Sequence, residues 1–287
     1  MKLWLHLALA WAAMAQQSQN PSPMVEHSRT HPRLTEQTPK GRREKLELGT
    51  LYVPAGVTAG KRPAVLFFFH GGTWLPELAG LRNQTAIVAV QAGSGSATYA
   101  RLFEDPKRFL ELLGEAEKKA GFKFSHVMVG GWSAGCGAIR QLLQDPDTYK
   151  RVEGALMIDG IHTDYAEGKP GPLDSKISTA NLEIWIKLGR DAIAGRKRVI
   201  VTHSEIFPGT FASTTETADY LVNQLDLKLR PVMKWGPMGT QQISEATAGR
   251  FLMMGFAGNS APDHVDQLHS LPIFLKWMRG PRTAVKP

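Results

Sequence analysis

The sequence contains a single cysteine, Cys136, in a chain of 287 residues. One cysteine cannot form a disulfide within the chain, and it cannot supply the group of thiolates that holds a structural zinc ion. We therefore expect the stability of the protein to come from a buried apolar core.

Long hydrophobic runs are also missing. The segment Leu3–Met14 is shorter than the roughly 18 to 20 apolar residues needed to span a bilayer, and no later uncharged segment reaches that length. Lys2 precedes this segment and Ala13-Met14-Ala15 ends it, which is the order typical of a secretory signal peptide. We expect cleavage near Ala15, export to the periplasm or the medium, and no stable membrane insertion.

The motifs of several cofactor-dependent proteins are absent. Gly93-Ser94-Gly95-Ser96 lacks the third glycine of a dinucleotide fingerprint, and the glycines around Ser133 lack the Gly-Lys pair of a phosphate loop. No His-Glu-x-x-His sequence supports a metal site built from His162, His203, His264 or His269. We expect a protein without cofactor or metal.

Acidic residues are fewer than basic ones, which gives a net charge of +8. The excess is scattered, apart from a cluster of Arg42, Arg43 and Lys45 around Glu44. Because no aromatic residues are interleaved with this cluster, it is typical of a solvated face and not of a nucleic-acid interface. We expect no nucleic-acid partner, and the sequence leaves the oligomeric state open.

The chain divides into three parts. After the expected signal peptide at 1–15, residues 16–45 are polar and without apolar period, which predicts a flexible leader. A folded domain is expected over 46–287, and its first strand should end at Pro54. No internal repeat is visible.

Short apolar runs then alternate with amphipathic segments. Such runs suit strands buried on both faces, and strict alternation with helices predicts a doubly wound, mostly parallel α/β sheet with helices on both faces. The expected strands are Ala64–Phe69, Ala86–Val90, His126–Val129, Ala155–Ile158, Val199–Val201 and Phe251–Phe256. The expected helices are Lys107–Lys119, Ala134–Gln144, Leu182–Ala194, Thr214–Leu225 and Leu268–Met278.

The third of these strands leads into Gly131-Trp132-Ser133-Ala134-Gly135, the pattern G-x-S-x-G between a strand and a helix. The chemistry of a nucleophile elbow needs this spacing, because the glycines let strand and helix approach while the serine is held on a tight turn. Ser133 is therefore the candidate nucleophile. The N–H of Ala134, at the start of the helix, is a candidate oxyanion donor.

The first buried strand ends in Phe69-His70-Gly71-Gly72-Thr73-Trp74, and with the elbow this resembles the α/β-hydrolase superfamily. The resemblance covers the chain from about Leu46 onward and implies a second oxyanion donor on the N–H of Gly72 or Thr73. It also implies a triad in the order nucleophile, acid, histidine. His70 fits a structural role in this loop better than that of a base.

The resemblance implies a histidine near the C-terminus and an acid after a strand. His264, expected on a loop that begins at Gly258, is favoured over His269, which lies further into the predicted helix. Two carboxylates compete as the acid. Asp159 ends the strand at 155–158, and Glu205 follows the strand at 199–201, so both stay candidates, with a slight preference for Asp159.

Together these features predict a serine esterase that forms an acyl-enzyme on Ser133, with a small-molecule or lipid-like ester as substrate. Trp74 and Trp132 are candidate substrate contacts. The long connections 161–198 and 207–250 can form small lids but no large cap domain. The alternatives are an acyltransferase using the same site, a non-catalytic binding protein with this fold, and a metal-dependent enzyme.

Overall fold

The computed structural model describes residues 33–168 and 176–280, so the expected signal peptide at 1–15 lies outside the described residues. The strands are β1 (Gly41–Lys45), β2 (Thr50–Pro54), β3 (Ala64–Phe69), β4 (Ala86–Val90), β5 (His126–Trp132), β6 (Gly154–Ile158), β7 (Arg198–Ser204), β8 (Arg230–Trp235), β9 (Gln241–Ala248) and β10 (Phe251–Phe256). The helices are α3 (Trp74–Asn83), α4 (Ser96–Arg101), α5 (Arg108–Ala120), α6 (Cys136–Leu142), α7 (Pro146–Arg151), α8 (Glu183–Ile193), α9 (Thr214–Gln224), α10 (Ala261–His269) and α11 (Leu271–Arg279).

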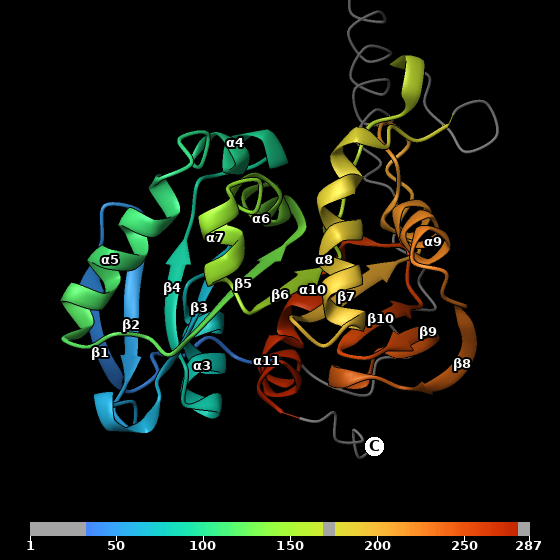
Figure 1. Cartoon of the computed structure of the whole chain (residues 1–287). Helices are drawn as coiled ribbons and strands as arrows, with labels where there is room; N and C mark the ends of the chain where they lie inside the picture. Colours follow the sequence, from blue (N-terminus) through green and yellow to red (C-terminus); the bar gives the residue numbers. More distant parts are fainter. Residues whose placement is uncertain (1–32, 169–175, 281–287) are drawn as a thin grey trace, which may run out of the picture.

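All ten strands lie in one sheet, in the order β1-β2-β4-β3-β5-β6-β7-β10-β9-β8 (Figure 1). The six central strands, from β4 to β10, run parallel, while β1 and β2 at one edge and β9 and β8 at the other pair antiparallel. The predicted mostly parallel α/β sheet is therefore confirmed. Because the central strands are parallel, their carboxyl ends meet at one edge of the sheet.

Strand β3 shows why both faces of the sheet are covered. All six of its residues are buried, and they alternate between two cores. On one face Phe67 packs edge-on against Phe109 of α5, with 4.9 Å between ring centroids. On the other face Phe68 lies in a core with Leu75 of α3 and Phe274 of α11. Helices thus lie on both sides of the sheet (Figure 1).

The sheet begins earlier than the sequence predicts. Residues 41–45, expected in the flexible leader, form β1 and pair with β2. The basic cluster is not a purely solvated face, because the Arg43 guanidinium donates hydrogen bonds to both carboxylate oxygens of Glu77, a side chain that is 7% exposed. Arg33 forms an ion pair with Asp266 at 2.7 Å. The end of the leader therefore packs on the domain.

The long connection 207–250 contains more than the predicted helix. After α9 it forms the hairpin of β8 and β9, which extends the sheet at its edge. Strand β8 is mostly exposed and contains Pro231, so it lacks the buried apolar pattern by which the central strands were recognised. Within the described ranges, no helix has the length and apolar character needed to cross a membrane.

Candidate active site

The predicted nucleophile elbow is present between β5 and a short 3-10 turn, η2 (Ser133–Gly135), that leads into α6. Ser133 has φ of 51°, in the left-handed region that L-residues other than glycine rarely adopt. Close packing explains the flanking glycine, because any other residue at position 135 would place its Cβ only 2.0 Å from the carbonyl oxygen of Phe69. The turn thus holds Ser133 at the carboxyl end of a central strand.

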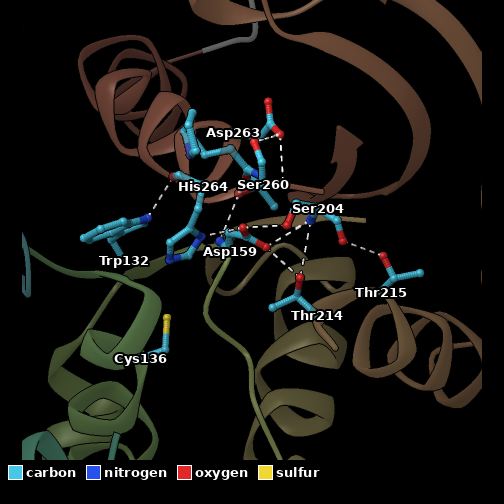
Figure 2. Close-up of polar contacts among 12 residues, drawn as sticks. Trp132, Cys136, Asp159, Ser204, Thr214, Thr215, Ser260, Asp263 and His264 are labelled. Carbon is cyan, nitrogen blue, oxygen red and sulfur yellow. Dashed lines mark hydrogen bonds and ion pairs between the residues drawn. The ribbon is translucent and has the colours of Figure 1, made fainter. Parts of the chain in front are cut away.

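His264 and Asp159 form a direct pair next to this turn. Nδ1 of His264 lies 2.6 Å from Oδ2 of Asp159, although the two residues are 105 positions apart (Figure 2). Ser133, Asp159 and His264 line one cavity of about 400 Å³. The structure therefore brings together three of the residues that the sequence proposed as catalytic.

The carboxylate of Asp159 is held by more than the histidine. Its side chain is 2% exposed. The backbone N–H of Ser204 donates to Oδ1 at 3.0 Å, the Ser204 hydroxyl donates to Oδ2 at 2.7 Å, and the Thr214 hydroxyl donates to Oδ1 at 2.6 Å (Figure 2). Burial alone raises the pKa of Asp159, but the hydrogen bonds from His264, Thr214 and Ser204 hold it below its ordinary value. Asp159 is thus an oriented carboxylate at neutral pH.

Glu205 and His269, the rival candidates, lie apart from this pair. Glu205 is exposed, and its carboxylate accepts a hydrogen bond from the N–H of Gly258 at 3.1 Å. His269 accepts a hydrogen bond at Nδ1 from the N–H of Leu34 at 3.1 Å and packs against Trp74. The geometry favours Asp159 as the acid and His264 as the base.

His264 does not lie on a loop, and the expectation of a loop over 258–264 is wrong. The residue lies in α10, which begins at Ala261 with Pro262 in its first turn. The N–H and the hydroxyl of Ser260 both donate to the Asp263 carboxylate, at 2.9 and 2.5 Å. These contacts fix the helix start, so the position of His264 is set by a capped helix.

No family model and no curated protein matches this sequence, but solved structures match its fold. Esterase 2 of Thermogutta terrifontis, phosphonylated by cyclosarin, superimposes with a TM-score of 0.50 at 16% identity, covering 87% of this chain and 98% of the esterase chain. The chain has the α/β-hydrolase fold. The acetyl xylan esterase of Aspergillus awamori is similar at 12% identity, with a TM-score of 0.43 over 77% of this chain and 93% of that chain.

In this α/β-hydrolase fold, Trp132 holds the histidine and does not line the cavity. Its ring lies between His70, stacked at 5.0 Å, and His264, tilted at 4.6 Å, and its Nε1–H donates to the carbonyl of His264 at 3.1 Å. His70 in turn bonds to the Tyr99 hydroxyl at 2.9 Å. Neither Trp132 nor Trp74 is among the residues that line the cavities at Ser133. The geometry gives Trp132 contacts that position His264, while the substrate contacts predicted for Trp132 and Trp74 stay predictions.

The oxyanion donors differ in how well the structure places them. Ala134 is buried and lies in η2, the turn that leads into α6. It also lines a second cavity at Ser133, of about 430 Å³. Gly72 and Thr73 are exposed and line neither cavity. Ala134 thus lies next to the nucleophile, and the donor roles of Ala134 and of Gly72 or Thr73 stay predictions.

Other reactive side chains near the site are occupied or sealed. Burial raises the pKa of the Cys136 thiol, so this cysteine under the elbow is protonated and not nucleophilic. Nδ1 of His203 lies 3.0 Å from the Thr215 hydroxyl. In the described part of the chain, no three histidine, cysteine or acidic side chains gather as a metal-binding group.

His203 makes stability depend on pH. Burial lowers the pKa of this 4% exposed histidine to about 4, so the unfolded chain binds the proton first as pH falls. The contribution of neutral His203 to the free energy of unfolding is complete above a pH of about 6.5. As the pH falls towards 4 this contribution, on the order of 3 kcal/mol, is lost. We expect His203→Asn to reduce the difference in free energy of unfolding between pH 7 and pH 4.5, measured by urea titration. Wild-type protein titrated in parallel gives the reference, and a difference that is the same in the variant and in wild type contradicts the prediction.

Proposed function

We propose that the protein is an exported serine hydrolase that cleaves carboxylic esters through an acyl-enzyme on Ser133. The observation that carries the proposal is the 2.6 Å contact of His264 with buried Asp159, in the cavity that Ser133 lines on its strained turn. Export rests on the signal-like segment at 1–15 and agrees with a chain that has one buried cysteine. The fold shared with an esterase that cyclosarin phosphonylates supports the reaction class.

The contacts of His264 define its role in this mechanism. Asp159 accepts a hydrogen bond from Nδ1, which leaves Nε2 to take the proton of the Ser133 hydroxyl. The serine oxygen attacks the ester carbonyl and forms a tetrahedral intermediate, whose oxyanion accepts hydrogen bonds from the N–H of Ala134 and of Gly72 or Thr73. His264 returns the proton to the leaving alkoxide. Water, activated by the same histidine, then hydrolyses the acyl-enzyme.

The positive charge that forms on His264 is stabilised locally. Asp159 is ionised and its remaining lone pairs are occupied by Ser204 and Thr214, so it cannot rotate away from the imidazole. The tilted contact with Trp132, at 4.6 Å between ring centroids, restricts the same imidazole further. Both restraints place the base before substrate arrives, which lowers the cost of reorganisation in the transition state.

The experiment that tests the function is the hydrolysis of p-nitrophenyl acetate, butyrate and octanoate by the purified protein. We expect saturable turnover and a burst of p-nitrophenol of one equivalent per enzyme where deacylation is slower than acylation. Treatment with a chelator should leave the rate unchanged, because no step uses a metal. A folded protein that hydrolyses none of these esters contradicts the proposal, and loss of activity with the chelator points to a metal-dependent enzyme.

A further inference from the structure

Two cavities meet at Ser133, and different charged side chains line them. The cavity of about 400 Å³, here called the histidine compartment, includes His264 and the side chains of Ile206, Phe207 and Pro262. The cavity of about 430 Å³, here called the arginine compartment, includes Ser96, Arg140, Asp164 and Asn181. His162 and Phe211 line both. An ester bound at Ser133 extends one part into each compartment.

Arg140 lines the arginine compartment as a charged group without a partner among the described residues. Its side chain makes no hydrogen bond or ion pair within residues 33–168 and 176–280, although it is half-buried. Burial lowers the pKa of Arg140 and nearby Asp164 partly offsets this, yet a guanidinium keeps its charge at any physiological pH. A partly desolvated cation with free N–H donors is costly by itself and binds an anionic group well.

His162 adds a second donor between the two compartments. Within the part of the chain that the structure describes, its Nδ1 is buried without a hydrogen-bond partner, and Nε2 has no partner either but is not sealed from solvent. Burial lowers the pKa of His162 to about 4, so the ring is neutral at pH 7. A buried nitrogen lone pair without a donor costs less free energy than a buried N–H without an acceptor. The sealed Nδ1 of His162 therefore carries the lone pair, and Nε2 carries the single ring proton. Nε2 thus offers an N–H to the cavity that the ring lines.

The proposed mechanism decides which part of the ester occupies which compartment. His264 must protonate the leaving alkoxide, so the alcohol part lies on its side, in the histidine compartment. The other cavity at Ser133, the arginine compartment, then receives the acyl chain, which extends towards Arg140.

We propose that the substrate is a half-ester of a dicarboxylic acid with an apolar alcohol, whose free carboxylate binds Arg140, with Asn181 and Nε2 of His162 as further donors. This inference rests on the proposed function. Asp164 lines the same compartment and repels such a carboxylate, but its side chain is exposed, so solvent and salt screen it more than half-buried Arg140. The two residues therefore act in opposite directions on the same charge.

The test compares monobutyl succinate, glutarate and adipate with the corresponding butyl esters that end in a carboxamide. The amides have nearly the same shape without the charge. For the best chain length we expect kcat/KM, measured as butanol release, to be higher for the acid than for its amide. Arg140→Gln should lower this acid-to-amide ratio about 10- to 100-fold, the range for a charge-assisted contact. Asp164→Asn should raise it, and Arg190→Gln, at an exposed arginine outside both cavities, should leave it unchanged.

The outcomes separate this inference from the function on which it rests. If the protein hydrolyses p-nitrophenyl butyrate but prefers the amide at every chain length, the carboxylate site is wrong and the serine mechanism stands. The same conclusion follows if Arg140→Gln and Arg190→Gln change the ratio alike. If neither butyl nor p-nitrophenyl esters are cleaved, the proposed function itself fails. Active-site titration with a phosphonate checks that each variant is folded.

Discussion

Replacing Ser133 with alanine is expected to lower kcat for ester hydrolysis about 10⁴- to 10⁶-fold, to a rate near that of the oxyanion donors and binding alone. The hydroxyl is the only group at this turn that can form the acyl-enzyme, because the nearby Cys136 thiol is buried and protonated. Alanine has the same Cβ as serine, so the strain of φ at 51° does not increase and the elbow should fold. Steady-state hydrolysis of p-nitrophenyl butyrate measures the effect.

Ser125→Ala is the matched control, since Ser125 is exposed and directly precedes β5, at the end of this strand opposite to Ser133. It should retain wild-type kcat. Activity that survives in Ser133→Ala within tenfold of wild type contradicts the assignment of the nucleophile. Equal losses in both variants point to impurity or misfolding instead.

Asp159→Asn is expected to lower kcat about 10⁴-fold, because an amide in place of the carboxylate favours the wrong tautomer of His264 and cannot stabilise its positive charge. Asparagine tolerates the left-handed conformation, and Asp159 has φ of 44°, so the backbone should keep its shape. Glu205→Gln should change kcat less than about threefold, because Glu205 bonds to Gly258 and not to the base. Parallel assays of the two variants on one ester give the comparison.

The opposite ranking, with Glu205→Gln inactive and Asp159→Asn active, overturns the assignment of the acid. A thermal melt on each variant separates loss of the acid from loss of the fold. Asp159→Asn also removes an acceptor for Ser204 and Thr214, so some loss of stability is expected with it.

Local patterns were enough to predict the central strands of the sheet. The runs 64–69, 86–90 and 251–256 coincide with β3, β4 and β10 because a strand buried on both faces must be apolar at every position. The elbow was predictable for a related reason, since a tight strand-to-helix turn needs small residues at fixed positions around Ser133. Both signals are contained in a few consecutive residues.

The edge strands and the supports of the site were not predictable in this way. Strand β1 is polar and is defined by its pairing with β2, and the contact of Arg43 with buried Glu77 joins residues far apart in the sequence. Ser204 and Thr214 reach Asp159 only because β6 and β7 are neighbours and α9 begins beside them. One signal was available and missed: Ser260 with Asp263 three positions later, and Pro262 between them, is the pattern of a helix start.

The most direct test of the serine mechanism is covalent labelling of the purified protein by a fluorophosphonate, with the modified residue located by mass spectrometry of peptides. We expect one adduct per chain, on Ser133, formed quickly in wild type and far more slowly in His264→Ala, while His269→Ala is labelled at the wild-type rate. Absence of an adduct on folded wild-type protein, or an adduct on another residue, contradicts the assignment of Ser133 as the nucleophile.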